Sequence, residues 1–290
     1  MPHGTRRAPG THSAPGTHAP DPRRRPSSLV TVRGGLRLSY ASHGEGPAVV
    51  LLPGPTDSWR SYEPVLERLP SSIRAIAVSQ RGHGDSDKPA TGYEVEDFAA
   101  DVISLLDTLD IRQAVLVGHS GSCPVVRRVA VDHPDRVTGL VLEASPTTLV
   151  GDAGFQEFVT AVVSGLEDPI DPGLARAFVV ATSPHGIDPA VLDQFVDDLL
   201  QVPARVWRET FGALLRYDDT HLLGRIAAPT LLIWGDADEL VARPMQDELV
   251  ARIPGATLTI YSGVGHSPRW EDPSRFTRDV VEFVARSGPR

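Results

Sequence analysis

The clearest structural signal in this chain is an apolar run that stops abruptly at a serine between small residues, Ala114-Val115-Leu116-Val117-Gly118-His119-Ser120-Gly121-Ser122. An uninterrupted apolar run bounded by glycine is typical of a buried strand in a parallel sheet. Residues 124–130 predict a helix, because a proline is tolerated in a first helical turn. Ser120 is therefore expected at a tight strand-to-helix turn, where a strained backbone exposes the side chain and only small neighbours fit.

A serine in such a turn is suited to nucleophilic catalysis. The backbone N–H of Gly121 is expected at the N-terminus of the following helix, where it can stabilise an oxyanion. Cys123, the only cysteine of the chain, is the alternative nucleophile. Because Ser120 already occupies the exposed position, we interpret Cys123 as part of the packing of that helix.

Two later segments add an acid and a base. Residues 230–234 form an apolar run that leads to Asp238, and residues 256–261 form a run that leads to His266. A histidine between Gly265 and a Ser-Pro turn is expected on a loop rather than inside an element. Serine, then an acid after a strand, then a histidine after the last strand is a chain order that assembles a catalytic triad on a parallel sheet.

These motifs make residues 29–288 resemble the α/β-hydrolase superfamily, specifically its cap-bearing serine hydrolases. The resemblance implies that Ser120 is the nucleophile, His266 the general base and Asp238, three residues after Gly235, the acid. Glu143 is a second candidate for the acid, because some relatives place their acid after the strand that follows the nucleophile. Asp236 is a third, although a turn or loop-capping role suits it better. The motifs lie in order along the chain: Pro53-Gly54-Pro55-Thr56, Gln80 to Ser86, the serine turn, the acid loop, and Gly265-His266 followed by Glu271-Asp272-Pro273.

The chain departs from the superfamily pattern at two places near the predicted site. Ser122 stands where the serine turn usually has a third small glycine, and we interpret it as a tolerated change. Pro53 stands where relatives usually have a histidine, and Pro55 occupies the position whose backbone N–H is the second oxyanion donor. Proline has no N–H, so the second donor is displaced, supplied by a side chain such as that of Thr56, or absent. We predict an oxyanion site made of Gly121 and Thr56.

The sequence divides into three parts. Residues 1–28 are rich in proline, glycine and arginine, which predicts a disordered tail outside the folded protein. Alternating strand and helix signals in 29–145 and 224–288 predict a mostly parallel sheet flanked by helices, beginning with a hairpin around Gly34-Gly35. Residues 146–223 carry only helical patterns, which predicts an all-helical cap inserted after the strand that follows the serine turn.

Composition excludes several partners. The formal net charge of −9 argues against a nucleic-acid or anionic membrane surface, because both require clustered positive charge. No apolar run approaches the ~20 residues that span a bilayer. A single cysteine fits a reducing cytosol, so we expect a cytoplasmic protein.

The predicted function is a cofactor-free, metal-free serine hydrolase that cleaves a small, largely apolar ester or lactone through a Ser-His-Asp acyl-enzyme mechanism. A carbon–carbon bond hydrolase with the same triad is one alternative. A ligand-binding or nearly inactive member of the fold is the other, and the altered oxyanion loop favours it. The sequence specifies neither the substrate nor an oligomeric state.

Overall fold

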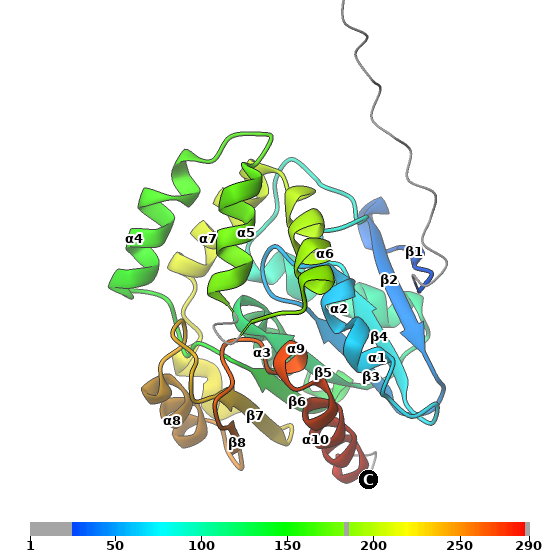
Figure 1. The fold of residues 1–290 in the computed structure, drawn as a ribbon. Helices are drawn as coiled ribbons and strands as arrows, with labels where there is room; N and C mark the ends of the chain where they lie inside the picture. Colours follow the sequence, from blue (N-terminus) through cyan, green and yellow to red (C-terminus); the bar gives the residue numbers. More distant parts are fainter. Residues whose placement is uncertain (1–24, 183–185, 288–290) are drawn as a thin grey trace, which may run out of the picture.

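A single eight-stranded sheet, ordered β1-β2-β4-β3-β5-β6-β7-β8, organises the computed structural model, which describes residues 25–182 and 186–287 (Figure 1). From β4 to β8 all neighbouring strands run parallel, and only β1 and β2 are antiparallel to their neighbours. The strands are β1 (Ser28–Thr31), β2 (Arg37–His43), β3 (Ala48–Leu52), β4 (Arg74–Val78), β5 (Ala114–His119), β6 (Val137–Glu143), β7 (Thr230–Gly235) and β8 (Thr257–Tyr261). The predicted α/β-hydrolase fold is confirmed by this sheet.

The hairpin expected at the start of the folded region is present. β1 pairs antiparallel with β2, and Gly34 and Gly35 both take a φ of 83° in the turn between them, a conformation that favours glycine. The first strand begins at Ser28, one residue before the predicted start of folded structure. Arg25 also contacts the fold, because its Nη1 donates to the Ser42 carbonyl oxygen at 3.3 Å. The rest of the predicted tail, residues 1–24, lies outside the described residues.

The strands alternate their side chains between two apolar cores, one on each face of the sheet. One core is covered by α2 (Val95–Thr108), α3 (Cys123–Asp132) and α8 (Arg243–Arg252). The other is covered by α1 (Glu63–Leu66) and α10 (Pro273–Arg286). Phe98, Val102, Leu105 and Leu106, which follow one another at helical spacing, lie on the buried face of α2. Within residues 25–182 and 186–287, no helix is both long and apolar enough to cross a membrane.

The order of the strands creates a crevice at one edge of the sheet. β3 lies between β4 and β5, so the chain leaves β3 toward one side and then crosses over it to form β5. In open parallel sheets, such a reversal leaves a crevice at the carboxyl ends of the two strands, where ligands bind. The loops that follow β3, β5, β7 and β8, which contain Pro55, Ser120, Asp238 and His266, all start at that edge.

Between β6 and β7 the chain forms a helical insertion that lies beyond this edge of the sheet (Figure 1). It contains α4 (Ala153–Ala161), α5 (Pro172–Ala181), α6 (Pro189–Leu200) and α7 (Ala204–Arg216). In the part of 146–223 that the structure describes there are helices and turns but no strand. The assignment of 146–223 to a separate cap stays a prediction.

A buried arginine of α3 connects the two ends of the insertion. Arg127 is 0% exposed and donates to the Pro146 carbonyl oxygen at 2.7 Å, where the chain leaves the sheet. Its other guanidinium nitrogens bind the Asp219 carboxylate at 2.7 and 2.9 Å, where the chain returns. A bidentate pair of this kind fixes both distance and angle. The insertion is thereby held at a defined place above the helix that follows Ser120.

Candidate active site

Ser120 sits on the strained turn that the sequence predicts. Its φ is 51°, in the left-handed region that a side chain occupies at a cost of order 1–3 kcal/mol. The turn is tight, because a Cβ added to Gly118 would lie only 2.9 Å from the Ser122 carbonyl oxygen. Glycine at this position therefore allows β5 and α3 to approach closely, and the turn presents the Ser120 hydroxyl to the cavity described below.

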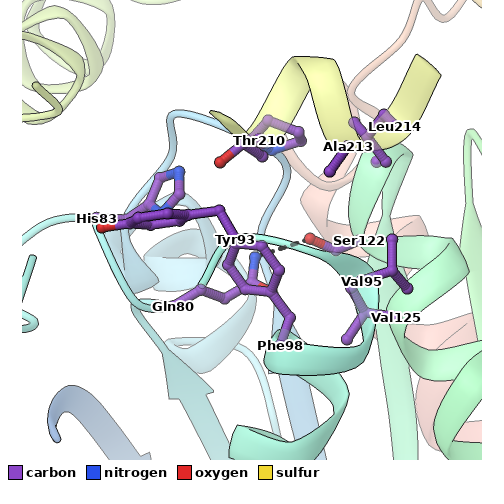
Figure 2. A pocket seen from close by; sticks show the side chains of 12 residues that line it. Gln80, His83, Tyr93, Val95, Phe98, Ser122, Val125, Thr210, Ala213 and Leu214 are labelled. Carbon is purple, nitrogen blue, oxygen red and sulfur yellow. Dashed lines mark hydrogen bonds between the residues drawn. The ribbon is translucent and has the colours of Figure 1, made fainter. Parts of the chain in front are cut away.

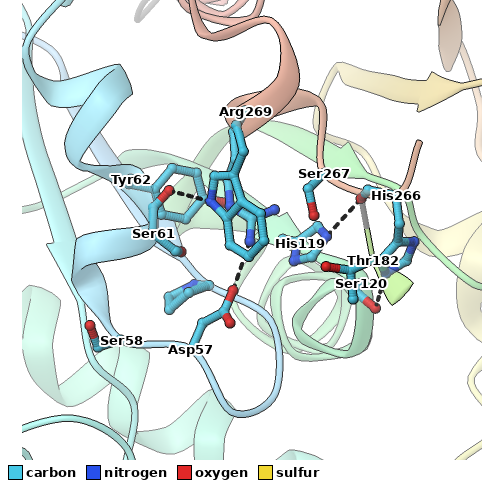
Figure 3. A network of polar contacts seen from close by, with 12 residues as sticks. Asp57, Ser58, Ser61, Tyr62, His119, Ser120, Thr182, His266, Ser267 and Arg269 are labelled. Atoms are coloured by element: carbon cyan, nitrogen blue, oxygen red, sulfur yellow. Dashed lines mark hydrogen bonds and ion pairs between the residues drawn. The ribbon is translucent and has the colours of Figure 1, made fainter. Parts of the chain in front are cut away.

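Ser120, His266 and Asp238 form one hydrogen-bonded chain. The Ser120 Oγ lies 2.9 Å from His266 Nε2 (Figure 3). The Nδ1 of His266 lies 2.9 Å from Asp238 Oδ2. A carboxylate can only accept, so Nδ1 carries the imidazole proton and Nε2 is free to accept the serine proton. The three side chains come from the loops after β5, β8 and β7, and the structure brings them together as the sequence analysis expected.

The Asp238 carboxylate is held in place by backbone amides of its own loop. The N–H groups of Leu240 and Val241 donate to Oδ1 at 2.9 and 3.0 Å, while Oδ2 faces His266. Backbone donors of this kind favour the charged carboxylate and fix its orientation. The neighbouring Asp236 instead accepts from the Gly263 N–H at 2.6 Å, which is the loop-capping role expected for it.

The other candidate acid, Glu143, belongs to a different contact. It is 0% exposed and accepts from the backbone N–H of Arg269 at 2.9 Å and from its guanidinium Nη1 at 3.3 Å. Arg269 also binds the Asp57 carboxylate through Nη2 at 2.7 Å (Figure 3). Glu143 therefore pairs with an arginine beneath the site, whereas the Nδ1 of His266 faces Asp238.

Arg269 thus binds two carboxylates, those of Asp57 and Glu143. Arg269 is 0% exposed, and its guanidinium lies over the Trp270 ring at 4.3 Å from the ring centroid. Burial raises the pKa of Asp57 to about 7, since desolvation of its carboxyl outweighs the attraction of Arg269. Burial also raises the pKa of Glu143, against the opposing effect of the same arginine.

His119, next to the serine, supports the histidine loop. Its Nε2 donates to the backbone carbonyl oxygen of His266 at 3.0 Å, and the two rings lie 4.9 Å apart. Burial lowers the pKa of His119 well below the usual value, so the ring is neutral and its Nδ1 carries no proton. This confirms the interpretation of His119 as a packing and hydrogen-bonding residue.

Ser122 does more than fit a small space. Its hydroxyl accepts from Gln80 Nε2 at 2.8 Å (Figure 2). It also donates to the Pro53 carbonyl oxygen at 2.6 Å. Gln80 Nε2 also donates to the Pro53 carbonyl oxygen at 3.0 Å. A glycine at position 122 has no hydroxyl and could make neither of these two hydrogen bonds. The change from the superfamily pattern therefore ties the serine turn to the loop after β3.

That loop carries a proline against the oxyanion position. A Cβ added to Gly121 would lie 2.7 Å from the Pro55 Cγ, so the proline ring packs against the residue that follows Ser120. Thr56 takes a φ of 77° and is 2% exposed, and its hydroxyl has no hydrogen-bond partner. Pro55 and Gly121 line the cavity at the serine, whereas Thr56 does not. The structure does not bring the Thr56 side chain to the place predicted for it.

Cys123 is the packing residue that the sequence analysis expected. It is 0% exposed, and its thiol contacts the Gly118 carbonyl oxygen at 3.1 Å. Burial raises the pKa of the Cys123 thiol to about 12, so the thiolate that a nucleophile needs is not formed near neutral pH.

A cavity of about 600 Å³ opens at the Ser120 hydroxyl, between the carboxyl ends of the strands and the helical insertion. It is large enough for a small organic ligand. Its far side is aromatic, formed by Phe155, Phe158, Phe178 and Phe211 of α4, α5 and α7. Over residues 25–182 and 186–287, no group of three or more His, Cys, Asp or Glu side chains is arranged to hold a metal ion.

Sequence reasoning missed the residues that support this site. Gln80 and Arg269 lie in motifs near the predicted loops, yet nothing in their spacing indicates that both are buried beneath the cavity. Asp57 follows the oxyanion loop and lines the cavity. Its position two residues after Pro55 was the one sequence feature that could have indicated its place near the site.

Known proteins resemble this chain along most of its length. The family model of the alpha/beta hydrolase fold matches residues 47–273. The chain is 31% identical to a non-heme chloroperoxidase of Streptomyces lividans, over 88% of this chain and 98% of that protein. It is 30% identical to a 2-hydroxy-6-oxononadienedioate/2-hydroxy-6-oxononatrienedioate hydrolase of Paraburkholderia xenovorans, over 87% and 92% of the two chains. Among solved structures, the enol-lactonase from Burkholderia xenovorans superposes with a TM-score of 0.78 at 25% identity, covering 89% of this chain and 100% of that one. The chain belongs to the α/β-hydrolase fold family, and its relatives identify it as a hydrolase.

Proposed function

We propose that this protein is a serine hydrolase that cleaves a small, largely apolar ester or lactone without a cofactor. The observation that carries the proposal is the continuous chain from Ser120 through His266 to Asp238, with both hydrogen bonds at 2.9 Å. The serine opens into a largely apolar cavity of about 600 Å³. A relative of known structure is named an enol-lactonase, which supports a cyclic or open ester as the substrate class.

The geometry suits an acyl-enzyme mechanism. The Ser120 hydroxyl oxygen attacks the ester carbonyl carbon while His266 Nε2 takes the hydroxyl proton. His266 then returns that proton to the leaving alkoxide as the carbon–oxygen bond of the ester breaks. Asp238 orients the imidazole and stabilises its positive charge. Water, activated by the same histidine, then hydrolyses the acyl-serine.

We propose that the oxyanion is stabilised mainly by the backbone N–H of Gly121. Pro55, at the position of the second donor, has no N–H, and the Thr56 side chain does not line the cavity. Losing one oxyanion donor lowers the rate by ~10²–10³ in a well-studied serine protease. The proposed enzyme is therefore a slower esterase than a relative with two donors.

The test combines an ester panel with three variants. The wild type is expected to hydrolyse short-chain p-nitrophenyl esters, and Ser120→Ala to lose that turnover with an unchanged melting temperature. Asp238→Asn is expected to lower kcat far more than Glu143→Gln, because only Asp238 contacts His266. Substantial turnover by Ser120→Ala, or the opposite ranking of the two acid variants, would contradict the proposed roles.

A carbon–carbon bond hydrolase is a second candidate, because the Paraburkholderia xenovorans relative carries such a printed name. The same triad would serve both reactions, so the distinction rests on substrate. Hydrolysis of diketones at a higher kcat/KM than that of esters and lactones would favour this second function.

A further inference from the structure

Among its described lining residues, the cavity beside the proposed nucleophile contains acids but no basic side chain able to bind an anion. Besides Asp238, the carboxyl groups of Asp57, Asp152 and Glu239 line it. Among the described residues that line the cavity there is no lysine or arginine. The histidines among the described lining residues are His266, whose Nδ1 and Nε2 bind Asp238 and Ser120, and the neutral His119.

The nearby arginine does not change this balance. Arg269 is 0% exposed and is bound to the carboxylates of Asp57 and Glu143, so one positive charge faces two acids. Because it lies behind Asp57 and does not line the cavity, its guanidinium does not contact a ligand there. The buried cluster therefore adds no positive potential to the site.

Two other acids lie at the periphery of the cavity. Asp152 caps α4 by accepting from the Phe155 N–H at 2.8 Å, and it is partly exposed. Glu239 is exposed in the loop after β7, next to Asp238. Both side chains carry a carboxyl group, and the whole chain has a formal net charge of −9. A ligand that approaches the cavity meets a negative field.

The opposite wall is apolar and aromatic. Phe158, Phe178 and Phe211 pack against one another with ring centroids 5.6 to 6.3 Å apart. Ring faces provide area for an alkyl or aryl group, and their negative quadrupole attracts a cation but not an anion. The aromatic wall and the peripheral carboxylates therefore both disfavour an anionic ligand.

We propose that this cavity accepts esters whose acyl group is uncharged or cationic and discriminates against acyl groups that end in a carboxylate. The inference rests on the proposed esterase function and specifies its substrate class. It also separates this chain from its carbon–carbon hydrolase relative, whose printed name describes a substrate with two carboxylates.

The test compares four p-nitrophenyl esters with the same leaving group and similar acyl length: valerate, glutaramate, hemiglutarate and the ester of γ-butyrobetaine. Glutaramate and hemiglutarate differ only in a terminal amide or carboxylate, so their ratio isolates charge from size and polarity. The assays run at pH 8. We take the carboxylates of Asp152 and Glu239 to lie about 8 Å from the terminal carboxylate of the ligand, at an effective dielectric constant of about 40. Their repulsion then predicts a kcat/KM for hemiglutarate at least roughly tenfold below that for glutaramate. The γ-butyrobetaine ester is expected to match or exceed glutaramate.

Variants identify the source of the discrimination. Asp152→Asn and Glu239→Gln, combined, are expected to raise the hemiglutarate-to-glutaramate ratio of kcat/KM by about threefold to tenfold, and high salt is expected to raise the wild-type ratio similarly. Glu67→Gln is the matched control, because Glu67 is exposed and does not line the cavity. Its ratio is expected to equal that of the wild type.

The outcomes separate the two proposals. Hydrolysis of valerate with equal kcat/KM for glutaramate and hemiglutarate overturns the charge inference while leaving the esterase proposal intact. A ratio that the double variant leaves unchanged also overturns the inference. No hydrolysis of any of the four esters contradicts the proposed function itself, and the inference fails with it.

Discussion

Replacing Arg269 with methionine is expected to destabilise the fold strongly, because the arginine neutralises buried acids. Its guanidinium binds Asp57 at 2.7 Å and Glu143 at 3.3 Å, and both Arg269 and Glu143 are 0% exposed. Methionine keeps the unbranched, apolar first part of the side chain and the backbone N–H that donates to Glu143. What is lost is the positive charge beneath the site.

The magnitude follows from the charge left behind. Removing one partner of a buried ion pair costs about 3–5 kcal/mol in the free energy of unfolding, because the other charge stays desolvated. In this variant Glu143 would keep only two hydrogen bonds, one from the backbone N–H of residue 269 and one from the Tyr62 hydroxyl at 3.4 Å. The loss is expected to be largest at pH 8 and to shrink at pH 5, where a carboxyl with a raised pKa takes up a proton.

Equilibrium unfolding in urea, followed by circular dichroism, measures this effect. Adding Glu143→Gln to Arg269→Met is expected to recover much of the loss, since both members of the pair are then uncharged. Arg275→Met is the matched control: Arg275 lies over the Tyr261 ring, but its side chain is 33% exposed. It should cost no more than about 1 kcal/mol. A loss below about 1 kcal/mol for Arg269→Met, or no recovery in the double variant, would refute the reasoning.

Three further predictions concern the groups around the serine. Folding raises the pKa of Asp57 from 3.8 to about 7, so the stability that this group contributes is full at low pH and is lost as pH rises through that window. Asp57→Asn should therefore gain stability relative to the wild type between pH 5 and pH 8, as urea unfolding at each pH would show; a constant difference would contradict the raised pKa. Native protein should resist alkylation of Cys123 by iodoacetamide at pH 8, while urea-unfolded protein reacts, and equal rates measured by mass spectrometry would show that the thiol is accessible. Pro55→Phe restores a backbone N–H beside Gly121 and should raise kcat for esters within the ~10²–10³ that one donor contributes; a lower kcat in a stably folded variant would show that the native loop already has a second donor.

Local patterns predicted the elements of this fold well, because each strand and its loop are short and chemically distinct. The apolar run before Ser120 became β5, and the runs before Asp238 and His266 became β7 and β8. Parallel strands bring their carboxyl ends to one edge, so the order of motifs along the chain sufficed to predict which side chains meet. The hydrogen bonds from Ser120 to His266 and from His266 to Asp238 fit that expectation.

Contacts between distant segments were not predictable in the same way. The sequence favours Asp238 as the acid and leaves Glu143 as a second candidate, and only the three-dimensional position of Arg269 shows what Glu143 binds. Likewise, Ser122 reads as a small residue, but its hydroxyl bonds to Pro53, 69 positions earlier in the chain. Such partners depend on how loops from different strands pack, which residue spacing does not encode.

Helix ends and short helices were also predicted less accurately than strands. The apolar spacing from Tyr62 to Leu69 predicts one helix, but the structure has a 3-10 turn, Trp59–Tyr62, followed by a single α-helical turn, Glu63–Leu66. The helix ends where the chain must turn back toward β4 at Arg74. Tertiary packing therefore shortened a segment whose local pattern would allow a longer helix.

Labelling by a fluorophosphonate probe tests most directly whether Ser120 is an activated nucleophile. The probe phosphonylates only a serine whose hydroxyl proton can be taken up by a neighbouring base, and it requires no knowledge of the natural substrate. We expect one adduct, mapped by mass spectrometry to the peptide that contains Ser120, and its loss in His266→Ala. A wild-type protein that is folded but unlabelled, or an adduct on any other residue, would contradict it.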